Sequence, residues 1–304
     1  MTIPPGSVFK TVSALALLES KTVRIDETLH CQGYLHTPDR LRCYAFQRYG
    51  VGHGKLSLAS ALAQSCNVFF FHHAPNMGPA PLIDWSLRLG FGRPTGVDLP
   101  GESRGVLPTP INIESLERHP WRTGDTRALA IGQGSLAVTP LQIVRMMAAV
   151  ANGGRLVTPH VAAELGVSDA SSSAKDDRLP VPEIGSVGSI NPATLAAVRA
   201  GLRQAVSDPQ GTAHATVKLS DITVAGKTGT AETGGDRPPH AWLAGYAPAE
   251  APRLAFVVVL EHAGGGSSSA GPVVRRLVTA MDQLQLLGRR RANVAADKPA
   301  TRPM

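Results

Sequence analysis

The chain has 304 residues, of which 43% are hydrophobic and 17% are charged, a composition typical of a globular protein that can bury a full core. Its formal net charge of +7 favours anionic surroundings such as lipid headgroups or acidic polymers. Aromatic residues make up only 5% and do not alternate with basic ones, which argues against nucleic acid as a partner. The sequence shows no signal peptide and no stretch long enough to span a membrane.

The first predicted element is a helix over residues 7–20, whose apolar residues recur at helical spacing and form one buried stripe. Ser7 and Lys10 are three residues apart, so their side chains share a face of this helix, about 5–6 Å apart at Cβ. A lysine packed among valine and phenylalanine would have a lowered pKa and could accept the proton of the serine hydroxyl. An S-x-x-K string is common, however, and a solvated helix turn is the commoner explanation when it stands alone.

A segment with cysteines and glycines follows over residues 29–54, and after it the pattern predicts two helices separated by a break. The first helix covers residues 55–64 and ends at Ser65, and the second begins after Asn67. Serine and asparagine are good helix caps, so capping is the structural alternative to any catalytic role for these two residues.

All three cysteines of the chain, Cys31, Cys43 and Cys66, fall in one region that also contains His53. Three thiolates and one imidazole make a closed tetrahedral zinc set, and a structural metal there would brace the turn that holds Cys66. The alternative is a Cys31–Cys43 disulfide, plausible in an oxidising compartment, with Cys66 left as a buried thiol. The spacing is irregular and not of the C-x-x-C type, so both interpretations stay open, and zinc is the one we prefer.

The later elements are predicted from periodicity and from turn residues. In order they are a helix over 81–89, a loop-rich segment over 91–127, a helix over 141–150 with Thr139 as cap and Pro140 at its first position, a surface insertion near 167–189, a helix over 192–206, strands over 222–231, 241–247 and 254–261, a helix over 271–287 and a disordered basic tail over 288–304. Strands that follow a run of helices indicate an α/β or α+β fold with helices on an antiparallel sheet.

The string Lys227–Gly229 reads K-T-G and lies in the first predicted strand. Gly226 and Gly229 leave room there for another backbone or a ligand to come close. The order S-x-x-K, S-x-N, K-T-G is that of penicillin-binding proteins and class A β-lactamases, although Cys66 stands where the usual middle motif has aspartate. Three matches in order are far less expected by chance than any one of them.

With these motifs the chain resembles the transpeptidase domain of class B penicillin-binding proteins of the cell-elongation type. Further strings support the resemblance, namely GFG at 90–92, TGVDLP at 95–100, GQG at 132–134, TPLQ at 139–142 and HAWLAGYAP at 240–248. The resemblance implies a β-lactamase/D,D-peptidase-like, penicillin-recognising fold, with helices on both faces of an antiparallel sheet and an all-helical subdomain beside it. It also implies a membrane anchor, a pedestal domain and two strands ahead of the serine helix. We therefore expect residues 1–287 to be an N-terminally truncated transpeptidase domain whose central strand is left as an exposed edge.

The resemblance further implies a role for each motif residue, and no cofactor for catalysis. Ser7 would attack the carbonyl between the last two D-alanines of a peptidoglycan stem peptide, and Lys10 would accept its proton. Ser65 would relay a proton to the leaving amine, and Asn67 would hold Lys10 and the substrate amide. The strand residues implied to bind substrate are Lys227, Thr228, Gly229 and Thr230. The backbone N–H groups of Thr230 and Ser7 would form the oxyanion hole.

The partners implied are stem peptides, β-lactams that acylate Ser7 and, in the full-length protein, an elongation-complex glycosyltransferase and the periplasmic face of the inner membrane. Two other functions are kept open. A serine β-lactamase shares the three motifs, but no segment resembles the glutamate loop with which class A enzymes activate water. A truncated, non-catalytic scaffold of the elongation complex is the second alternative.

Overall fold

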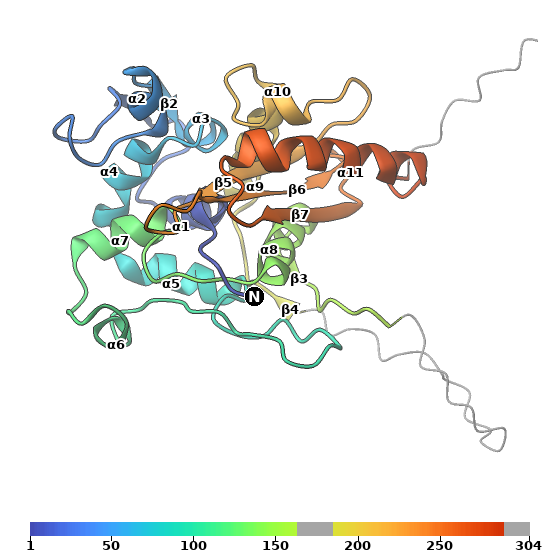
Figure 1. Cartoon of the computed structure of the whole chain (residues 1–304), viewed down its shortest axis with the longest axis horizontal. Helices are drawn as coiled ribbons and strands as arrows, with labels where there is room; N and C mark the ends of the chain where they lie inside the picture. The colour runs from blue at the N-terminus through green and yellow to red at the C-terminus, as the bar shows by residue number, and fades with distance from the viewer. Residues whose placement is uncertain (163–184, 289–304) are drawn as a thin grey trace, which may run out of the picture.

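The structure, a computed structural model, describes residues 1–162 and 185–288 (Figure 1). Most of the predicted insertion near 167–189 and nearly all of the predicted tail at 288–304 lie outside the described residues. The described end of the insertion forms the short strand β4 (Gly185–Ser186), which pairs antiparallel with β3 (Arg155–Leu156).

A three-stranded antiparallel sheet organises the C-terminal part of the chain, in the order β5-β6-β7. In its register Thr228 lies opposite Leu243, which in turn lies opposite Val258. Two helices pack on one face of this sheet and two on the other, with α8 below it and α11 above it in Figure 1. The elements are β5 (Ala225–Ala231), β6 (His240–Ala247) and β7 (Leu254–Leu260), with α8 (Pro140–Asn152) and α9 (Pro192–Ser207) on one side and α10 (His214–Val217) and α11 (Gly271–Gln283) on the other. The expected antiparallel sheet with helices on both faces is confirmed.

The region beside the sheet is mostly helical, as expected, but it is not all-helical. Its helices are α1 (Lys10–Glu19), α2 (Tyr44–Tyr49), α3 (Leu58–Ala63), α4 (Asn67–Met77), α5 (Pro79–Arg88), α6 (Ile113–Glu117) and α7 (Thr123–Ala130). Two short strands, β1 (Thr28–Cys31) and β2 (Gly54–Ser57), pair antiparallel with Cys31 opposite Gly54. The helix predicted over 55–64 is therefore wrong at its start, because residues 55–57 pair with residues 28–30 of β1.

Other predicted boundaries also differ from the structure. The segment 91–127 is not only loop, because it contains α6 and the start of α7. The strand predicted over 222–231 begins at Ala225, and the helix predicted over 271–287 ends at Gln283. These differences concern short or terminal turns, whose sequence patterns are the least informative.

Helix α8 shows how local sequence specifies an element. The Thr139 hydroxyl accepts a hydrogen bond from the backbone N–H of Gln142, and the Gln142 side chain accepts one from the backbone N–H of Thr139. Pro140 occupies the first turn, and Gly153 ends the helix with a φ of 90°. The predicted cap and start of this helix are confirmed.

Helix α1 lies at the centre of the molecule rather than at its surface. Every residue from Lys10 to Leu18 is buried, including the polar Thr11 and Ser13. The one-sided amphipathic helix expected from the sequence is therefore wrong, because other elements cover α1 on all sides. Its central position fixes the Ser7–Lys10 segment between the sheet and the helical region.

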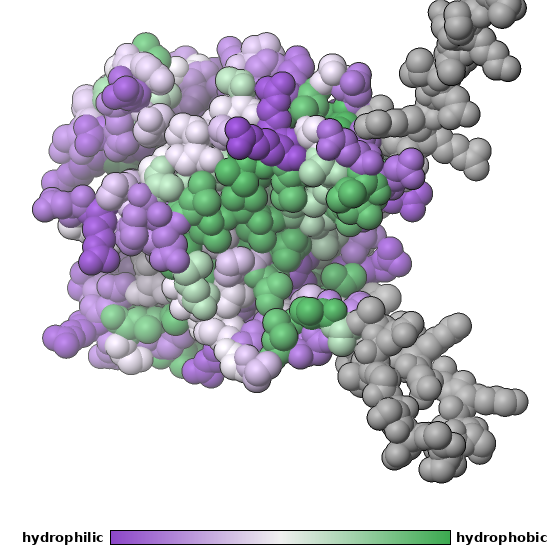
Figure 2. Space-filling model, turned by 45° about the vertical axis from the view of Figure 1, so that its right-hand side comes forward, coloured by the Kyte–Doolittle hydropathy of each residue, from purple (hydrophilic) through white to green (hydrophobic). Residues whose placement is uncertain are grey.

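Strand β7 is the outer strand of the sheet, and among the described residues no strand pairs with its free edge. All seven residues from Leu254 to Leu260 are apolar, and only Phe256 is fully buried. Figure 2 shows a broad hydrophobic area below the polar side chains of α11, where β7 lies. Such an edge lacks the charges and prolines that usually protect exposed strands from association.

We expect Val257→Lys, at the middle of β7, to raise the protein concentration at which aggregation begins by about twofold or more, because a charged edge resists strand addition. Light scattering measured against protein concentration gives the concentration at which aggregation begins. Val273→Lys on α11 adds the same charge at an exposed position away from the edge. Equal protection by both variants would mean that net charge, and not the free edge, controls association.

Candidate active site

Ser7 lies in a 3-10 turn, η1 (Gly6–Phe9), directly before α1, and not inside an α-helix as predicted. The turn follows from a close approach to β5, since a Cβ on Gly6 would lie 2.6 Å from the carbonyl oxygen of Thr230. Gly6 also has a φ of 53°, in the left-handed region that favours glycine. A Cβ on Gly229 would likewise lie 2.8 Å from the carbonyl oxygen of Pro5. The structure thus brings the first and the last motif together, backbone against backbone.

Lys10 is fully buried and joins the first motif to the second. Its Nζ donates hydrogen bonds to the carbonyl oxygen of Ser65 at 2.8 Å, to Ser65 Oγ at 3.2 Å and to Asn67 Oδ1 at 2.5 Å. Burial lowers the pKa of Lys10 to about 8, against a smaller opposing effect of Cys43 and Cys66. A lysine with this pKa can be neutral near physiological pH and can accept a proton.

The turn between α3 and α4 holds the second motif in a specific shape. Ser65 has a φ of 56°, which is uncommon for a residue other than glycine. Asn67 begins α4, and its Nδ2 donates to the carbonyl oxygen of Arg42 at 3.2 Å. Both residues therefore contact Lys10 from a constrained turn, which is more than helix capping requires.

Strand β5 carries the K-T-G string and packs against the segment that holds Ser7. Lys227 is buried, and its Nζ donates to the carbonyl oxygen of Thr228 at 3.0 Å. Burial lowers the pKa of Lys227 well below its usual value, and the nearby charge of Lys10 lowers it further. Thr230 Oγ1 accepts a hydrogen bond from the backbone N–H of Gly266 at 3.3 Å. The segments that carry the eight predicted residues thus contact one another, through Gly6 and Thr230, through Pro5 and Gly229, and through Lys10 with Ser65 and Asn67.

The three cysteines and His53 form a compact cluster beside this cleft. The Sγ atoms of Cys31 and Cys43 are 3.6 Å apart, those of Cys43 and Cys66 are 3.5 Å apart, and Cys31 Sγ lies 3.5 Å from His53 Nδ1. All four possible ligand atoms lie within 4.8 Å of one another. The cysteines are free, so the alternative Cys31–Cys43 disulfide is not formed in this structure.

The electrostatics of the cluster suit a cation. The pKa of Cys31 is lowered because Cys43 and Cys66 hydrogen-bond to its thiolate, while burial raises the pKa of Cys66. Burial opposes protonation of His53, but its bonds to Cys31 and Cys43 outweigh this effect and raise its pKa to about 9. Crowded sulfur atoms in a buried site gain most from a bound divalent cation, so the donor set fits zinc.

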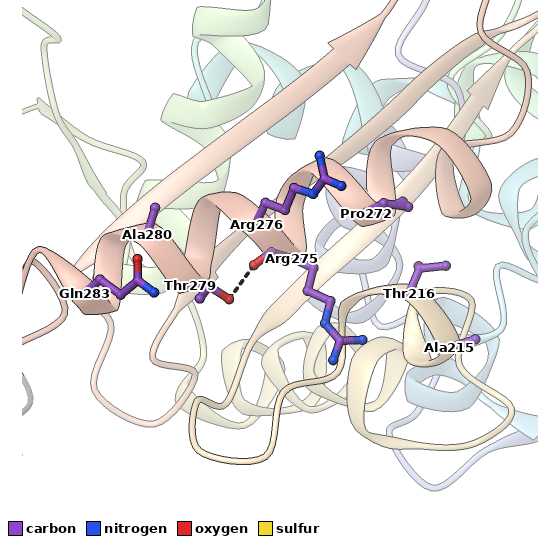
Figure 3. Close-up of a pocket in the computed structure, with 8 residues that line it drawn as sticks. All are labelled: Ala215, Thr216, Pro272, Arg275, Arg276, Thr279, Ala280 and Gln283. Atoms are coloured by element: carbon purple, nitrogen blue, oxygen red, sulfur yellow. Dashed lines mark hydrogen bonds between the residues drawn. The ribbon is translucent and has the colours of Figure 1, made fainter.

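Two residues of the site were not predicted from the sequence. Arg42 holds Asn67 through its carbonyl oxygen, and Thr212 Oγ1 accepts a hydrogen bond from Thr228 Oγ1 at 2.7 Å. No local pattern marks either residue, because each acts on a residue at least 16 positions away. A groove of about 500 Å³ between α10 and α11, drawn in Figure 3, contains none of the motif residues.

The comparison with known families decides the identification. Residues 1–279 match the family described as the penicillin binding protein transpeptidase domain. The chain belongs to this family. Among curated relatives, the peptidoglycan D,D-transpeptidase MrdA of Haemophilus influenzae is 31% identical over 289 residues, which cover 90% of this chain and 44% of that protein. MrdA of Escherichia coli K12 is 27% identical over 312 residues, 98% of this chain and 47% of that protein.

Solved structures agree with the family. A penicillin-binding protein, PBP2, from Helicobacter pylori superposes with a TM-score of 0.79 at 30% identity, over 93% of this chain and 50% of that one. PBP2 of Pseudomonas aeruginosa in complex with WCK 5153 gives a TM-score of 0.78 at 31% identity, over 97% of this chain and 64% of that one. The transpeptidase domain described here thus has the penicillin-recognising fold. It spans about half the length of the curated relatives that it matches.

Proposed function

We propose that this transpeptidase domain cross-links peptidoglycan stem peptides through an acyl-enzyme on Ser7. The observation that carries the proposal is the buried Lys10 ammonium, whose three hydrogen bonds reach both Ser65 and Asn67. Burial also lowers the pKa of Lys10 to about 8. A buried lysine with such a pKa is suited to act as the base for a nearby nucleophile.

In the proposed reaction Ser7 Oγ attacks the carbonyl carbon between the last two D-alanines, and Lys10 Nζ accepts the hydroxyl proton. The C–N bond then breaks, and the departing D-alanine amine receives a proton through Ser65 Oγ. An amine of a neighbouring stem peptide then attacks the ester carbon of the acyl-enzyme and forms the new amide. The C–O bond to Ser7 breaks, and the amine proton passes through Lys10 to Ser7 Oγ. By the family resemblance, the backbone N–H groups of Ser7 and Thr230 would form the oxyanion hole, and donors fixed in the backbone need no reorganisation during the reaction.

A bound carboxylate would act on the charge of Lys227 in the K-T-G strand. Burial and the charge of Lys10 lower the pKa of Lys227 and so oppose its ammonium form. A substrate carboxylate close to Lys227 opposes both effects and favours the ammonium form.

We further propose that Cys31, Cys43, His53 and Cys66 hold a structural zinc ion. A bound zinc would supply folding stability and no step of the reaction. The cluster is joined to the active site by two backbone contacts, since Cys43 Sγ accepts from the N–H of Val68 and Cys66 Sγ from the N–H of Phe69, both at 3.4 Å. These contacts orient the start of α4, where Asn67 lies.

The proposal extends to the whole protein. One solved relative is PBP2 of Helicobacter pylori in a complex with MreC, and another belongs to a peptidoglycan synthase complex that coordinates polymerization and crosslinking. By this similarity we propose residues 1–287 as a catalytic domain that works with a glycosyltransferase at the periplasmic face of the inner membrane. Among the described residues no helix is long and apolar enough to span a bilayer.

A fluorescent penicillin tests the proposed function. We expect a stable covalent label on the wild type and none on Ser7→Ala, which lacks the attacking oxygen, as measured by gel fluorescence and by mass spectrometry of the labelled peptide. Ser20→Ala, at the other end of α1, is the matched control and should label fully. Rapid loss of the label would favour a β-lactamase. A folded wild type that takes no label would leave only the scaffold function.

A further inference from the structure

The loop between α9 and α10, residues 208–213, contacts both the end of α3 and strand β5. The backbone N–H of Thr212 donates to the carbonyl oxygen of Ala63 at 3.2 Å, two residues before Ser65. The hydroxyl of the same residue accepts the hydrogen bond from Thr228 Oγ1 at 2.7 Å. Thr212 therefore joins the helix that ends at the second motif to the strand that carries the third.

The loop is held firmly enough to position a side chain. A Cβ on Gly211 would lie 2.4 Å from the carbonyl oxygens of Gln204 and Ala205, so this backbone is pressed against the end of α9. The backbone N–H of the buried Ala213 donates to the carbonyl oxygen of Ala205 at 2.9 Å. Thr212 lies between these two anchored residues, which hold its backbone in place beside Thr228.

The direction of the hydrogen bond between the two threonines decides what Thr228 offers to a ligand. In the structure Thr228 donates its proton to Thr212. A carboxylate accepts protons only, so it can bind Thr228 only when that hydroxyl turns. Thr212 can then donate in its turn to Thr228 Oγ1, which keeps both hydroxyl groups paired and strengthens the bond to the anion.

We propose that Thr212 is a positioning residue for the carboxylate-binding part of the cleft, acting through Thr228. The inference rests on the proposed function, because it assumes that a substrate or β-lactam carboxylate meets the K-T-G strand. Thr212 itself does not touch the reacting atoms. Its contribution should therefore appear only with ligands that carry the negative charge.

The test compares acylation by benzylpenicillin with acylation by its methyl ester, which lacks the charge, in Thr212→Val and Thr212→Ser. We expect Thr212→Val to lower the second-order rate constant with the acid about tenfold, the loss typical of a hydrogen bond that supports a charged group, and with the ester less than about twofold. Thr212→Ser keeps the hydroxyl and should stay within about twofold of the wild type with both ligands.

Thr216→Val is the matched control. Thr216 lies on α10 in the groove of Figure 3, away from the K-T-G strand. Its Oγ1 is 3.4 Å from Ser267 Oγ. This variant should leave both rate constants unchanged. Thr212→Ala removes the hydroxyl without adding a methyl group and gives the same comparison if Thr212→Val fails to fold.

The outcomes separate this inference from the proposed function. Equal losses with acid and ester, or no loss in Thr212→Val, would overturn the role of Thr212 while acylation of the wild type still stands. A wild type that reacts equally fast with both ligands would also overturn it. A wild type acylated by neither ligand would overturn the proposed function and this inference with it.

Discussion

Replacing Lys10 by alanine is expected to lower the rate of Ser7 acylation by about 10²–10⁴-fold, the usual contribution of a positioned general base. Lys10 is buried and donates to Ser65 and Asn67, so no solvent molecule can easily take its place. The rate constant with a fluorescent penicillin measures the loss. Lys21→Ala, an exposed lysine just beyond the same helix, is the matched control and should keep the wild-type rate.

The same lysine should set the pH dependence of acylation. Lys10 accepts a proton only in its neutral form, and burial lowers its pKa to about 8. The neutral fraction therefore falls as the pH drops below about 8, and the rate should fall about tenfold per pH unit there. Measuring the acylation rate constant between pH 6 and pH 9.5 tests whether the rate falls towards low pH. A flat profile in this range, or full activity of Lys10→Ala, would remove Lys10 from the role of base.

The second large effect is expected from the cysteine cluster. We expect freshly purified protein to contain about one zinc ion per chain, and strong chelation to lower the melting temperature by on the order of 10 °C, because structural zinc contributes directly to folding free energy. Acylation should fall as well, because Cys43 and Cys66 hold the start of α4 through Val68 and Phe69. Elemental analysis and calorimetry with and without chelator provide the measurements.

A matched pair of histidine variants separates zinc binding from general damage. His53→Ala removes one ligand of the cluster, whereas His72→Ala removes an exposed imidazole on α4 that lies outside it. Only the first should reduce zinc content and stability. Metal-free protein with a Cys31–Cys43 disulfide in mass spectrometry would contradict the zinc site and would favour the alternative interpretation.

The sequence placed the motif residues on segments that the structure brings into contact. Lys10 bonds to Ser65 and Asn67, and the turn that holds Ser7 packs against the Lys227–Thr230 strand. The four residues of the cysteine cluster were also proposed from the sequence, because three cysteines and a histidine fall in one region and suit zinc. Their compact arrangement needed the structure, since their spacing follows no known motif.

The errors of the sequence analysis have a common origin. Helix α1 was expected to have a solvated face, yet Thr11 and Ser13 are buried because other elements surround it. Residues 54–57 form a strand only because residues 28–31 lie beside them. Thr212 shows no local signal, since its importance comes from one hydrogen bond to Thr228. In each case the deciding partner is distant along the chain.

By itself, therefore, the sequence determined the features that near neighbours control: the Thr139–Gln142 cap that starts α8, the strand character of Lys227–Thr230 and the order of the three motifs. Only the tertiary structure decided how those parts meet. The 3-10 turn at Ser7 exists because Gly6 packs against the carbonyl oxygen of Thr230, more than two hundred residues later. The lowered pKa of Lys10 likewise comes from burial by the whole fold. Hydrogen bonds between near neighbours can be predicted from local residue types, whereas close packing and desolvation depend on every element that surrounds the site.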